Sequence, residues 1–458
     1  MTVDEMNQPA VAHRARDILG LAELERFPNA LPTRPEHLWR LDGFAANVPF
    51  TNPMFVPMGA VADPGLLYAA VSTVVGRHEA LRTRLALQDG RPVQIAENWK
   101  VRGLELIDVQ KRDLLDDRPG NKSAVSEFTQ SVLDLYAQEG FLCRAFRDED
   151  QNVSLGFVAH GYFSDAWSSQ VILRELRSAC AALKMGQAPA FAPVQQYTQY
   201  ALAQRRSLAR DLGTHLSYWQ QKFQSMSPAP LPYDQSGANG PRGRSYFFLR
   251  SDVLTGLLAA AEAHKLSLTL ILMAAYQLSL ARWTRGADIL SAAYTADRVH
   301  PEFHHTVGFL VTNMPICARI NRNGDLPTFL REFARDFYAS YAHRELSCEL
   351  YEAIFQPPKP FCASVFNFVP LQRNFFSSEL HSMTAFDGTI TGPDAEKPAI
   401  YRDLYLGLTQ YPNGILGKVF YNAGAFTPAR IETFIGHFRH VTQEIAADPR
   451  LKLKDLWH

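Results

Sequence analysis

One stretch of the sequence, residues 153–185, constrains the fold more than any other, because it reads as a strand, a polar turn and a long helix. The run VSLGFVAH (153–160) contains few polar residues, which is typical of a strand in a sheet covered on both faces. Ser164 or Asp165 can cap the helix that follows, since a short side-chain oxygen accepts hydrogen bonds from unpaired backbone N–H groups. We therefore expect His160 and the turn after it to lie at the mouth of a cleft.

At 458 residues the chain is too long for one hydrophobic core, and we expect two domains of about 150 to 250 residues each. Its 46 Lys and Arg residues balance 46 Asp and Glu residues, which argues against nucleic acid or an anionic membrane as a partner. The N-terminus has no apolar signal region, and no stretch approaches the roughly 18 apolar residues of a membrane span. The sequence therefore predicts a cytoplasmic protein, and we expect a monomer.

The cysteines indicate packed thiols rather than a disulfide framework or a metal site. They are five in number and widely spaced, without a CxxC pair or a Cys/His cluster at metal-ligand spacing. A catalytic cysteine would need a positioned base, and the sequence marks none. The five are Cys143, Cys180, Cys317, Cys348 and Cys362.

The first half of the chain alternates helices and strands. Residues 1–25 interleave apolar and charged side chains as a helix does, either packed on the body or serving as a docking appendage. A helix beginning near Pro64 runs into GRHEALRTRLAL (76–87), where we expect it to end and a strand to start. Charged residues crowd this junction, and we interpret His78 as part of a salt-bridged helix end rather than as a catalytic base. VSEFTQSVLDLYAQE (125–139) predicts another helix.

The second half follows a segment rich in Pro, Gly, Asn and Ser (227–244), and we place the lobe boundary between residues 185 and 230. The apolar run LSLTLILMAAYQLSLARWT (266–284) contains polar side chains and predicts a core helix rather than a membrane span. Strands are predicted at DILSAAYTA, CASVFNFV, DLYLGLTQY and GKVFYN, with helices at 326–343 and 428–446. This pattern indicates a second α+β lobe.

Seven motifs in order resemble the condensation domains of nonribosomal peptide synthetases and the wider HHxxxDG acyltransferase superfamily. GRHEALRTRL (76–85) is close to the family's RHExLRT motif, and HGYFSDAWSSQVILREL (160–176) occupies the place of HHxxxDGWSxxxLxxEL. ADRVHPEFHHTVGFLVTNMP (296–315) is similar to GRxxPELxxxIGxFVNTLP. The other four motifs are ALPTRPEHLWRL, YTQYALAQ, FCASVFNFVP and GILGKVFYNAGAFTPARIETFIGHF. The resemblance runs from about Phe27 to Leu453.

The resemblance implies an α+β fold of two chloramphenicol-acetyltransferase-like lobes in a V, with a central tunnel. We assign residues 1–25 to an N-terminal extension, 26–200 to the N-terminal lobe and 201–458 to the C-terminal lobe. Donor and acceptor would enter from opposite faces, with the acyl chain on the phosphopantetheine arm of an acyl or peptidyl carrier protein. Holding both in register makes a bimolecular aminolysis effectively intramolecular. The protein itself would bind no cofactor.

One position departs from the family pattern at the catalytic motif. Aligned on Asp165 and Trp167, the first motif histidine is His160, and the second, the family's general base, is replaced by Gly161. Glycine provides no imidazole, so the roughly 10²- to 10⁴-fold of general acid–base catalysis is not available from this position. The motif's last glycine is also replaced, by Ala166.

Other motif residues are retained. The resemblance implies a structural ion pair between Asp165 and Arg298, whose role is to position the turn more than to stabilise the protein. Trp167 is kept. Asn313 falls in the tunnel-lining asparagine region, in the order Thr-Asn where the family usually has Asn-Thr.

Three interpretations of the site are open. In the first, the protein joins an acyl thioester to an amine or hydroxyl through proximity and backbone donors near Gly161. In the second, it is a scaffold that recruits a carrier protein or a tailoring enzyme. In the third, a cyclisation or elimination runs in the same tunnel. The candidate proton carriers are His160, Tyr162 and Ser164 in the first case, and His304, His305 or Cys317 in the third.

Two of these candidates also have structural interpretations. We favour a packed, hydrogen-bonded role for His160 over catalysis, and a helix-capping role for Ser164, because no GxSxG elbow surrounds it. We nevertheless predict a stand-alone condensation-like acyltransferase of natural-product biosynthesis acting on a small-molecule acceptor, because the cleft motifs persist. The predicted catalytic residues are His160, Gly161, Tyr162, Ser164 and Asp165, with Trp167, Arg298, Asn313 and His305 supporting the tunnel.

Overall fold

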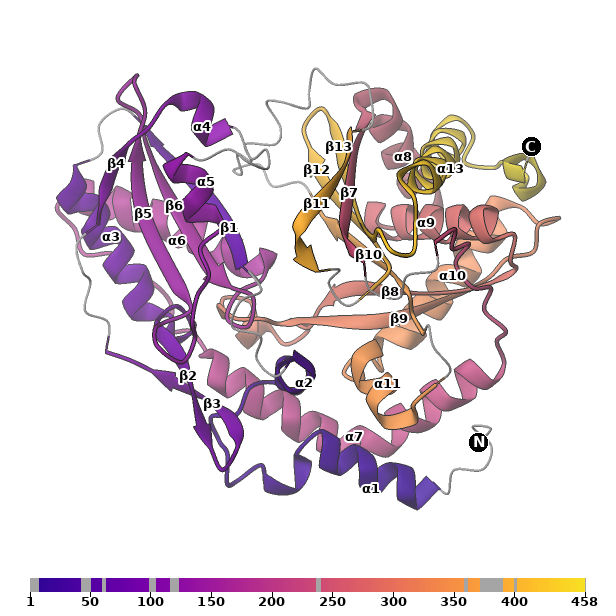
Figure 1. Cartoon of the computed structure of the whole chain (residues 1–458), viewed down its shortest axis with the longest axis horizontal. Helices are drawn as coiled ribbons and strands as arrows, with labels where there is room; N and C mark the ends of the chain where they lie inside the picture. Colours follow the sequence, from indigo (N-terminus) through magenta and orange to yellow (C-terminus); the bar gives the residue numbers. More distant parts are fainter. Residues whose placement is uncertain are drawn as a thin grey trace.

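The fold is taken from a computed structural model that describes residues 8–42, 51–59, 63–98, 104–115, 123–235, 240–357, 361–370, 390–398 and 402–457 (Figure 1). The strands are β1 (Thr51–Gly59), β2 (Thr83–Gln88), β3 (Arg91–Ala96), β4 (Leu106–Asp108), β5 (Phe141–Arg147), β6 (Val153–His160), β7 (Pro241–Arg250), β8 (Asp288–Ala296), β9 (Val311–Arg319), β10 (Ser364–Val369), β11 (Ile390–Pro398), β12 (Leu404–Tyr411) and β13 (Gly414–Asn422). The main helices are α1 (Gln8–Ile18), α2 (Thr33–Asp42), α3 (Pro64–Arg77), α4 (Lys111–Leu115), α5 (Ala124–Thr129), α6 (Ala166–Lys184), α7 (Tyr197–Gln224), α8 (Ser251–His264), α9 (Leu268–Thr284), α10 (Leu326–Tyr341), α11 (Cys348–Phe355) and α13 (Pro428–Ala447).

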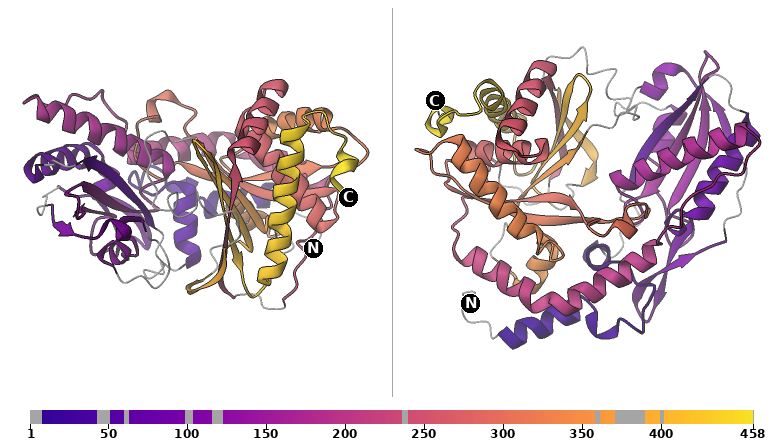
Figure 2. Two further views of the ribbon diagram at one scale, coloured as in Figure 1. Left: turned by 90° about the horizontal axis from the view of Figure 1, so that it is seen from above. Right: turned by 180° about the vertical axis from the view of Figure 1, so that it is seen from behind.

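The strands form two large sheets, one in each lobe. The N-terminal sheet has the order β1-β6-β5-β4, and the C-terminal sheet has the order β11-β7-β13-β12-β10-β8-β9. Figures 1 and 2 show the sheets in separate bodies, with α7 extending along both. The predicted two-lobe α+β architecture is confirmed. The V arrangement, the tunnel and the domain limits stay predictions, and the predicted limit at residue 200 falls in the first turn of α7.

The stretch that opened the sequence analysis folds as predicted. β6 lies between β1 and β5, and all of its residues except Ser154 are buried. Helices α3 and α6 pack against each other, and α6 also contacts β1 (Figure 1). A strand without polar relief thus becomes the centre of a covered sheet, and it carries His160 at its end.

The edge strand β1 was not predicted from sequence, because prolines interrupt it. Pro53 lies opposite Val158 and Pro57 opposite Ser154 in the antiparallel ladder with β6. Proline lacks a backbone N–H group, and strands tolerate it at an edge, where that position points away from the ladder. The prolines therefore made a strand improbable from the sequence, although the edge of the sheet accommodates them.

The predicted helix at 125–139 is wrong beyond its first turns. α5 ends at Thr129, and the following segment turns inward to bury Leu133 and Leu135. The backbone N–H of Leu85 on β2 donates to the carbonyl of Leu135 at 2.7 Å. Packing against β2 outweighs the helical pattern of the segment.

The apolar run at 266–284 forms the buried helix α9, as predicted. Two of its polar side chains donate hydrogen bonds inside the core: Gln277 Nε2 donates to Ser291 Oγ at 2.6 Å, and Ser279 Oγ donates to the Ala275 carbonyl at 2.6 Å. In the described part of the chain, no single helix has the length and apolar character of a membrane span, although α8 and α9 taken together, bent by 105°, would pass on composition.

Helix α7 joins both lobes and the N-terminal segment. Arg205 on α7 is 2% exposed and donates to the Leu31 carbonyl from Nε at 2.7 Å and to the Leu19 carbonyl from Nη1 at 2.8 Å. Its Nη2 donates to the Glu36 carboxylate on α2. Val11 and Ala15 of α1 belong to the same buried core as the C-terminal lobe. Of the two alternatives for the leading helix, the described part packs on the body.

Candidate active site

The turn between β6 and α6 is held mainly by its own backbone. The N–H of His160 donates to the Gly140 carbonyl at 2.8 Å, and the N–H of Phe163 donates to the His160 carbonyl at 2.9 Å. Asp165 caps α6, because its Oδ1 accepts a hydrogen bond from the Ser168 N–H at 2.7 Å. Of the two capping residues that the sequence allowed, Asp165 takes the role.

His160 occupies a hydrogen-bonded core position. Its side chain is buried, and its Nδ1 accepts a hydrogen bond from the Tyr162 N–H at 3.1 Å. The Tyr162 ring packs edge-on at 4.9 Å between centroids. Burial lowers the pKa of His160 to about 3, so the imidazole is neutral at physiological pH and has little capacity to take up a proton. Gly161 and Ser164 are buried in the same turn.

Asp165 and Arg298 form the ion pair that the resemblance implies. Arg298 Nη1 donates to Oδ2 at 2.7 Å and Nη2 donates to Oδ1 at 3.0 Å, a bidentate arrangement in which both side chains are buried. The Leu310 N–H also donates to Oδ2 at 3.0 Å. The pair therefore fixes the N-terminus of α6 against the segment that follows β8.

A glycine in that segment completes the contact. Ser168 Oγ accepts a hydrogen bond from the Gly308 N–H at 3.0 Å. The ring of Tyr197 lies over Gly308, where an added Cβ would come within 2.2 Å of the tyrosine Cδ2. Only glycine permits this approach. Phe303 and Val307 of the same segment pack in the N-terminal core, so chain from the C-terminal half contributes to the N-terminal lobe.

Trp167 and His304 meet beside the ion pair. The indole Nε1 of Trp167 donates to the His304 carbonyl at 2.9 Å, and the indole ring lies 5.5 Å from the Arg298 guanidinium carbon. His304 Nε2 lies 3.0 Å from the Arg298 carbonyl. A carbonyl only accepts, so Nε2 carries the proton and Nδ1 is the acceptor nitrogen of the neutral ring.

His305, the adjacent residue, is exposed. Its Nδ1 lies 3.2 Å from Arg174 Nη2, which donates the hydrogen bond. Partial burial and then the charge of Arg174 lower its pKa. Its neighbour His304 is therefore the better placed of the two to accept a proton, because the acceptor nitrogen of His305 already faces a guanidinium group.

A cavity of about 910 Å³ adjoins the turn and is bounded by both lobes. Ser164, Asp165 and Trp167 line it from the N-terminal lobe, and Tyr294 and Tyr405 line it from the C-terminal sheet. Its lining residues also include Arg298, His304 and His305, but not His160, Gly161 or Tyr162. The predicted site residues thus divide into a set that faces this cavity and a set buried behind it.

Asn313 lies outside the lining of this cavity, in a buried cluster that sequence reasoning missed. Its Nδ2 donates to Glu349 Oε1 at 2.8 Å, and Arg34 Nη2 donates to the same oxygen at 3.2 Å. Arg402 Nη2 lies 3.9 Å from it. Burial alone would raise the pKa of Glu349, but the charges of Arg34 and Arg402 outweigh it and lower the pKa to about 2. The cluster links α2 to α11.

His78 and Cys317 have structural environments. His78 Nε2 lies 2.7 Å from Glu175 Oε2, and the histidine is 1% exposed, which confirms the interpretation as a salt-bridged helix end. Burial raises the pKa of Cys317 to about 12, so its thiol stays protonated, and it does not line the large cavity. Among the described residues, no group of three or more His, Cys, Asp or Glu is arranged to hold a metal ion.

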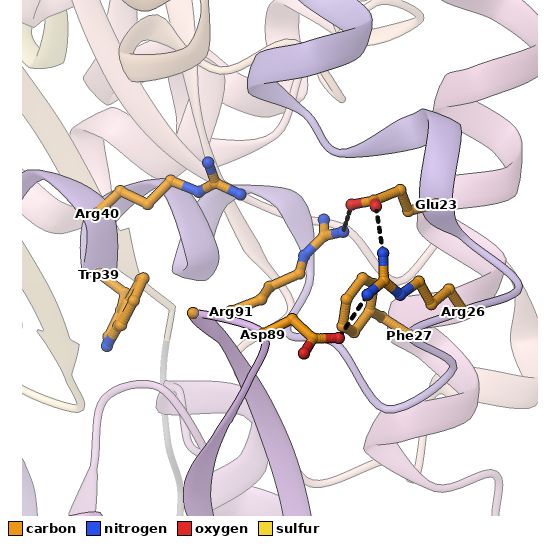
Figure 3. Close-up of a pocket in the computed structure, with 8 residues that line it drawn as sticks. Glu23, Arg26, Phe27, Trp39, Arg40, Asp89 and Arg91 are labelled. Atoms are coloured by element: carbon orange, nitrogen blue, oxygen red, sulfur yellow. Dashed lines mark hydrogen bonds and ion pairs between the residues drawn. The ribbon is translucent and has the colours of Figure 1, made fainter.

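A second cavity, of about 470 Å³, lies between α2, residues 23–27 and the turn from β2 to β3 (Figure 3). Its cations face carboxylates: Arg26 pairs with Glu23 at 3.1 Å and with Asp89 at 2.6 Å. Figure 3 shows Arg91 paired with Glu23, at 3.7 Å. Arg91 also pairs with the buried Glu36, at 2.9 Å. Because its charges are matched internally, this cavity joins the hairpin to the N-terminal segment rather than attracting a charged ligand.

Known proteins resemble the chain over almost its whole length. Chondramide synthase of Chondromyces crocatus is 26% identical over 448 residues, which are 96% of this chain and 11% of that protein. The X-domain from teicoplanin biosynthesis superposes with a TM-score of 0.73 at 19% identity, covering 93% of this chain and 96% of that chain, and it has also been solved in complex with OxyB.

A condensation domain solved with a substrate analogue superposes equally well. The first condensation domain of the calcium-dependent antibiotic synthetase, in complex with a substrate analogue, gives a TM-score of 0.76 at 17% identity, covering 93% of this chain and 98% of that chain. The family model for the condensation domain matches residues 50–458. The chain spans only a small part of the curated synthetases that it matches. With the motif turn, the Asp165–Arg298 pair and this match in place, the chain belongs to the condensation domain family.

Proposed function

We propose that the protein transfers an acyl group from a carrier-bound thioester to an amine or hydroxyl acceptor. The observation that carries this proposal is the cavity of about 910 Å³ that both lobes line beside the N-terminus of α6. Its volume lies in the range of small-molecule sites, which is about 300 to 1,000 Å³. The buried Asp165–Arg298 pair fixes its wall, so two substrates would meet a rigid surface.

His304 is the group that we propose as the proton acceptor in place of the missing motif histidine. It lines the cavity, and its tautomer is set by the hydrogen bond from Nε2 to the Arg298 carbonyl. Attack by the acceptor nitrogen or oxygen on the thioester carbonyl forms the new bond and breaks the C–S bond. The acceptor's proton passes to His304 Nδ1 and then to the departing thiolate of the phosphopantetheine arm, so the imidazole returns to its neutral form.

A second candidate function is recruitment without catalysis. It is favoured by the lack of a side chain at Gly161 and by the pKa of His160, which is about 3 and leaves this histidine neutral at physiological pH. The X-domain from teicoplanin biosynthesis, whose fold is similar, has been solved with OxyB bound. In this second function the two lobes present a docking surface for a carrier protein or a tailoring enzyme.

One experiment separates the two functions. The purified protein is incubated with acyl-loaded carrier protein and a panel of amines and alcohols, and products are followed by mass spectrometry. His304→Gln is expected to lower turnover about 10²-fold or more. The control is His300→Gln, which changes the same segment at an exposed residue outside the cavity lining and is expected to retain turnover.

The outcomes point in different directions. Turnover that His304→Gln leaves intact would remove His304 as the base, and a gain on Gly161→His would show that the missing imidazole limits the rate. Carrier binding without turnover for any acceptor would favour the recruitment function.

A further inference from the structure

A row of aromatic rings crosses the C-terminal sheet where it borders the large cavity. Tyr405 on β12 and Phe420 on β13 are direct antiparallel neighbours, with ring centroids 5.8 Å apart and planes inclined by 27°. Tyr294 on β8 continues the row at 6.1 Å from Tyr405. All three line the cavity and are half-buried. We call these three residues the aromatic wall.

Neighbouring groups hold the aromatic wall in place. The Tyr405 ring lies over Gly407, where an added Cβ would come within 2.8 Å of the tyrosine Cε1. The Tyr405 hydroxyl accepts a hydrogen bond from Asn367 Nδ2 at 2.9 Å. The Arg242 guanidinium carbon lies 4.6 Å from the centroid of the Phe420 ring. The rings are thus oriented by the protein itself, and a ligand meets them with little further loss of conformational entropy.

The cavity around the wall is rich in aromatic residues and its tyrosines are neutral. Of the 28 described residues that line it, nine are Phe, Tyr or Trp. Burial, and then the nearby Tyr294, raise the pKa of Tyr405 to about 12. Asp165 is the acidic residue among these described lining residues, and both of its oxygens bind Arg298. Cations also line the cavity, and one of them, Arg242, lies against the Phe420 ring; the described arginines are Arg174, Arg242, Arg298 and Arg402. The three rings of the wall are themselves uncharged and offer their faces and edges to a ligand.

We infer that the aromatic wall binds a planar aromatic group carried by one of the two substrates. This inference rests on the proposed function, because it names the substrate class of the same cavity. Aromatic rings gain from offset or edge-to-face contact with other rings, an attraction that a saturated ring of similar size lacks. A wall of pre-oriented rings therefore discriminates between aromatic and alicyclic groups more sharply than a wall of aliphatic side chains would.

The test compares matched ring pairs by isothermal titration calorimetry on the full chain. The donor arm uses the N-acetylcysteamine thioesters of 3-phenylpropanoic and 3-cyclohexylpropanoic acid, and the acceptor arm uses phenethylamine and 2-cyclohexylethylamine. In one arm the aromatic probe is expected to bind about 2- to 10-fold more tightly than its cyclohexyl partner, the gain typical of an aromatic pair. The arm that shows the preference identifies which substrate carries the ring.

Variants tie the preference to the wall. Phe420→Leu and the double variant Tyr405→Leu with Phe420→Leu are expected to abolish it, while Tyr405→Phe keeps the ring and is expected to retain it. The control is Tyr338→Leu, since Tyr338 is 59% exposed on α10 and lies outside the cavity lining. Thermal unfolding followed by circular dichroism checks that each variant is folded.

Two results would overturn the inference: equal binding of aromatic and cyclohexyl probes in both arms, or a preference that survives the double variant. If acyl transfer proceeds equally well with the aromatic and the cyclohexyl probes, the proposed function is kept and the inference about the aromatic wall is rejected. A wall-dependent preference without any turnover would support the inference and count against acyl transfer.

Discussion

At the scale of single residues, the turn after β6 places two buried ionisable side chains, Asp165 and His160, in contrasting environments. Asp165 is buried, but it accepts two hydrogen bonds from Arg298 and others from Ser168 and Leu310, so its charge is compensated. The side chain of His160 is also buried, and burial disfavours its charged form. Asp165 therefore keeps the positioning role of the motif, whereas His160 has little capacity to accept a proton.

The His160 environment predicts a pH dependence of stability. Its pKa is about 3 in the folded protein and 6.5 in the unfolded chain, so between these values the unfolded chain holds more protons. The free energy of unfolding should therefore rise with pH across this window, with His160 contributing up to about 1.4 kcal/mol per pH unit. His160→Gln is expected to flatten the curve by this amount between pH 5 and 6, measured by urea denaturation. At pH 8, above both pKa values, the difference between the two proteins should no longer change; an unchanged slope between pH 5 and 6 would contradict the assignment.

Sequence reasoning at this scale succeeded where residues belong to a motif and failed where they do not. Asp165 and Arg298 could be paired from the sequence because each occupies a family motif. Glu349 was missed, because its partner Arg34 is 315 positions away and no local pattern marks a buried carboxylate. The aromatic wall was missed for a related reason: Tyr405 and Phe420 belong to neighbouring strands of one hairpin, but Tyr294 comes from a strand more than 100 residues earlier in the chain.

At the scale of elements, α7 and β3 are both fixed to α2 by one buried carboxylate. Glu36 accepts hydrogen bonds from Arg205 on α7, Arg91 on β3 and Arg40 on its own helix. Burial alone would raise its pKa, but the charges of Arg205 and Arg91 outweigh it and lower the pKa. Three elements therefore depend on a single acidic side chain for their relative positions.

Glu36→Gln is expected to destabilise the protein by about 3 to 5 kcal/mol, because it leaves the Arg205 guanidinium group buried without its carboxylate partner and leaves Arg91 with only the more distant Glu23. The matched control is Glu25→Gln, which removes the partner of the next α7 arginine, Arg206, in a pair whose side chains are 84% and 57% exposed. That change should cost less than about 1 kcal/mol. Urea denaturation of both variants gives the comparison, and similar losses in the two would refute the argument.

The elements were predicted best where their burial is uniform. β6 and α9 were found because an apolar run stays apolar whichever neighbours cover it. β1 was missed because Pro53 and Pro57 are permitted only by an edge position that the sequence does not reveal. Residues 130–139 were misread because their apolar spacing suits a helix as well as the irregular, turn-containing segment beside β2 that tertiary packing selects.

At the scale of the whole molecule, the two lobes are connected through polar side-chain contacts, one buried and one exposed, as well as through the chain. Arg34 on α2 reaches Glu349 on α11, and Trp167 on α6 reaches the His304 carbonyl in the segment after β8. The large cavity lies among these contacts and takes lining residues from both lobes. Its shape therefore depends on how firmly the lobes are held together.

Glu349→Gln is expected to weaken this connection, because Arg34 and Arg402 would lose the charge that both face. We expect a loss of about 3 to 5 kcal/mol and, in differential scanning calorimetry, the replacement of one cooperative transition by two. A single transition that merely moves to lower temperature would mean that the lobes unfold together without this cluster.

The prolines of β1 have a consequence at the same scale. β1 is the outermost strand of its sheet on the side nearest the C-terminal lobe in Figure 1. Because Pro53 and Pro57 present no N–H groups along that border, a strand arriving from the other lobe or from another molecule finds an incomplete template. This border of β1 is thus poorly suited to pairing with a further strand, which favours two separate sheets over one continuous sheet.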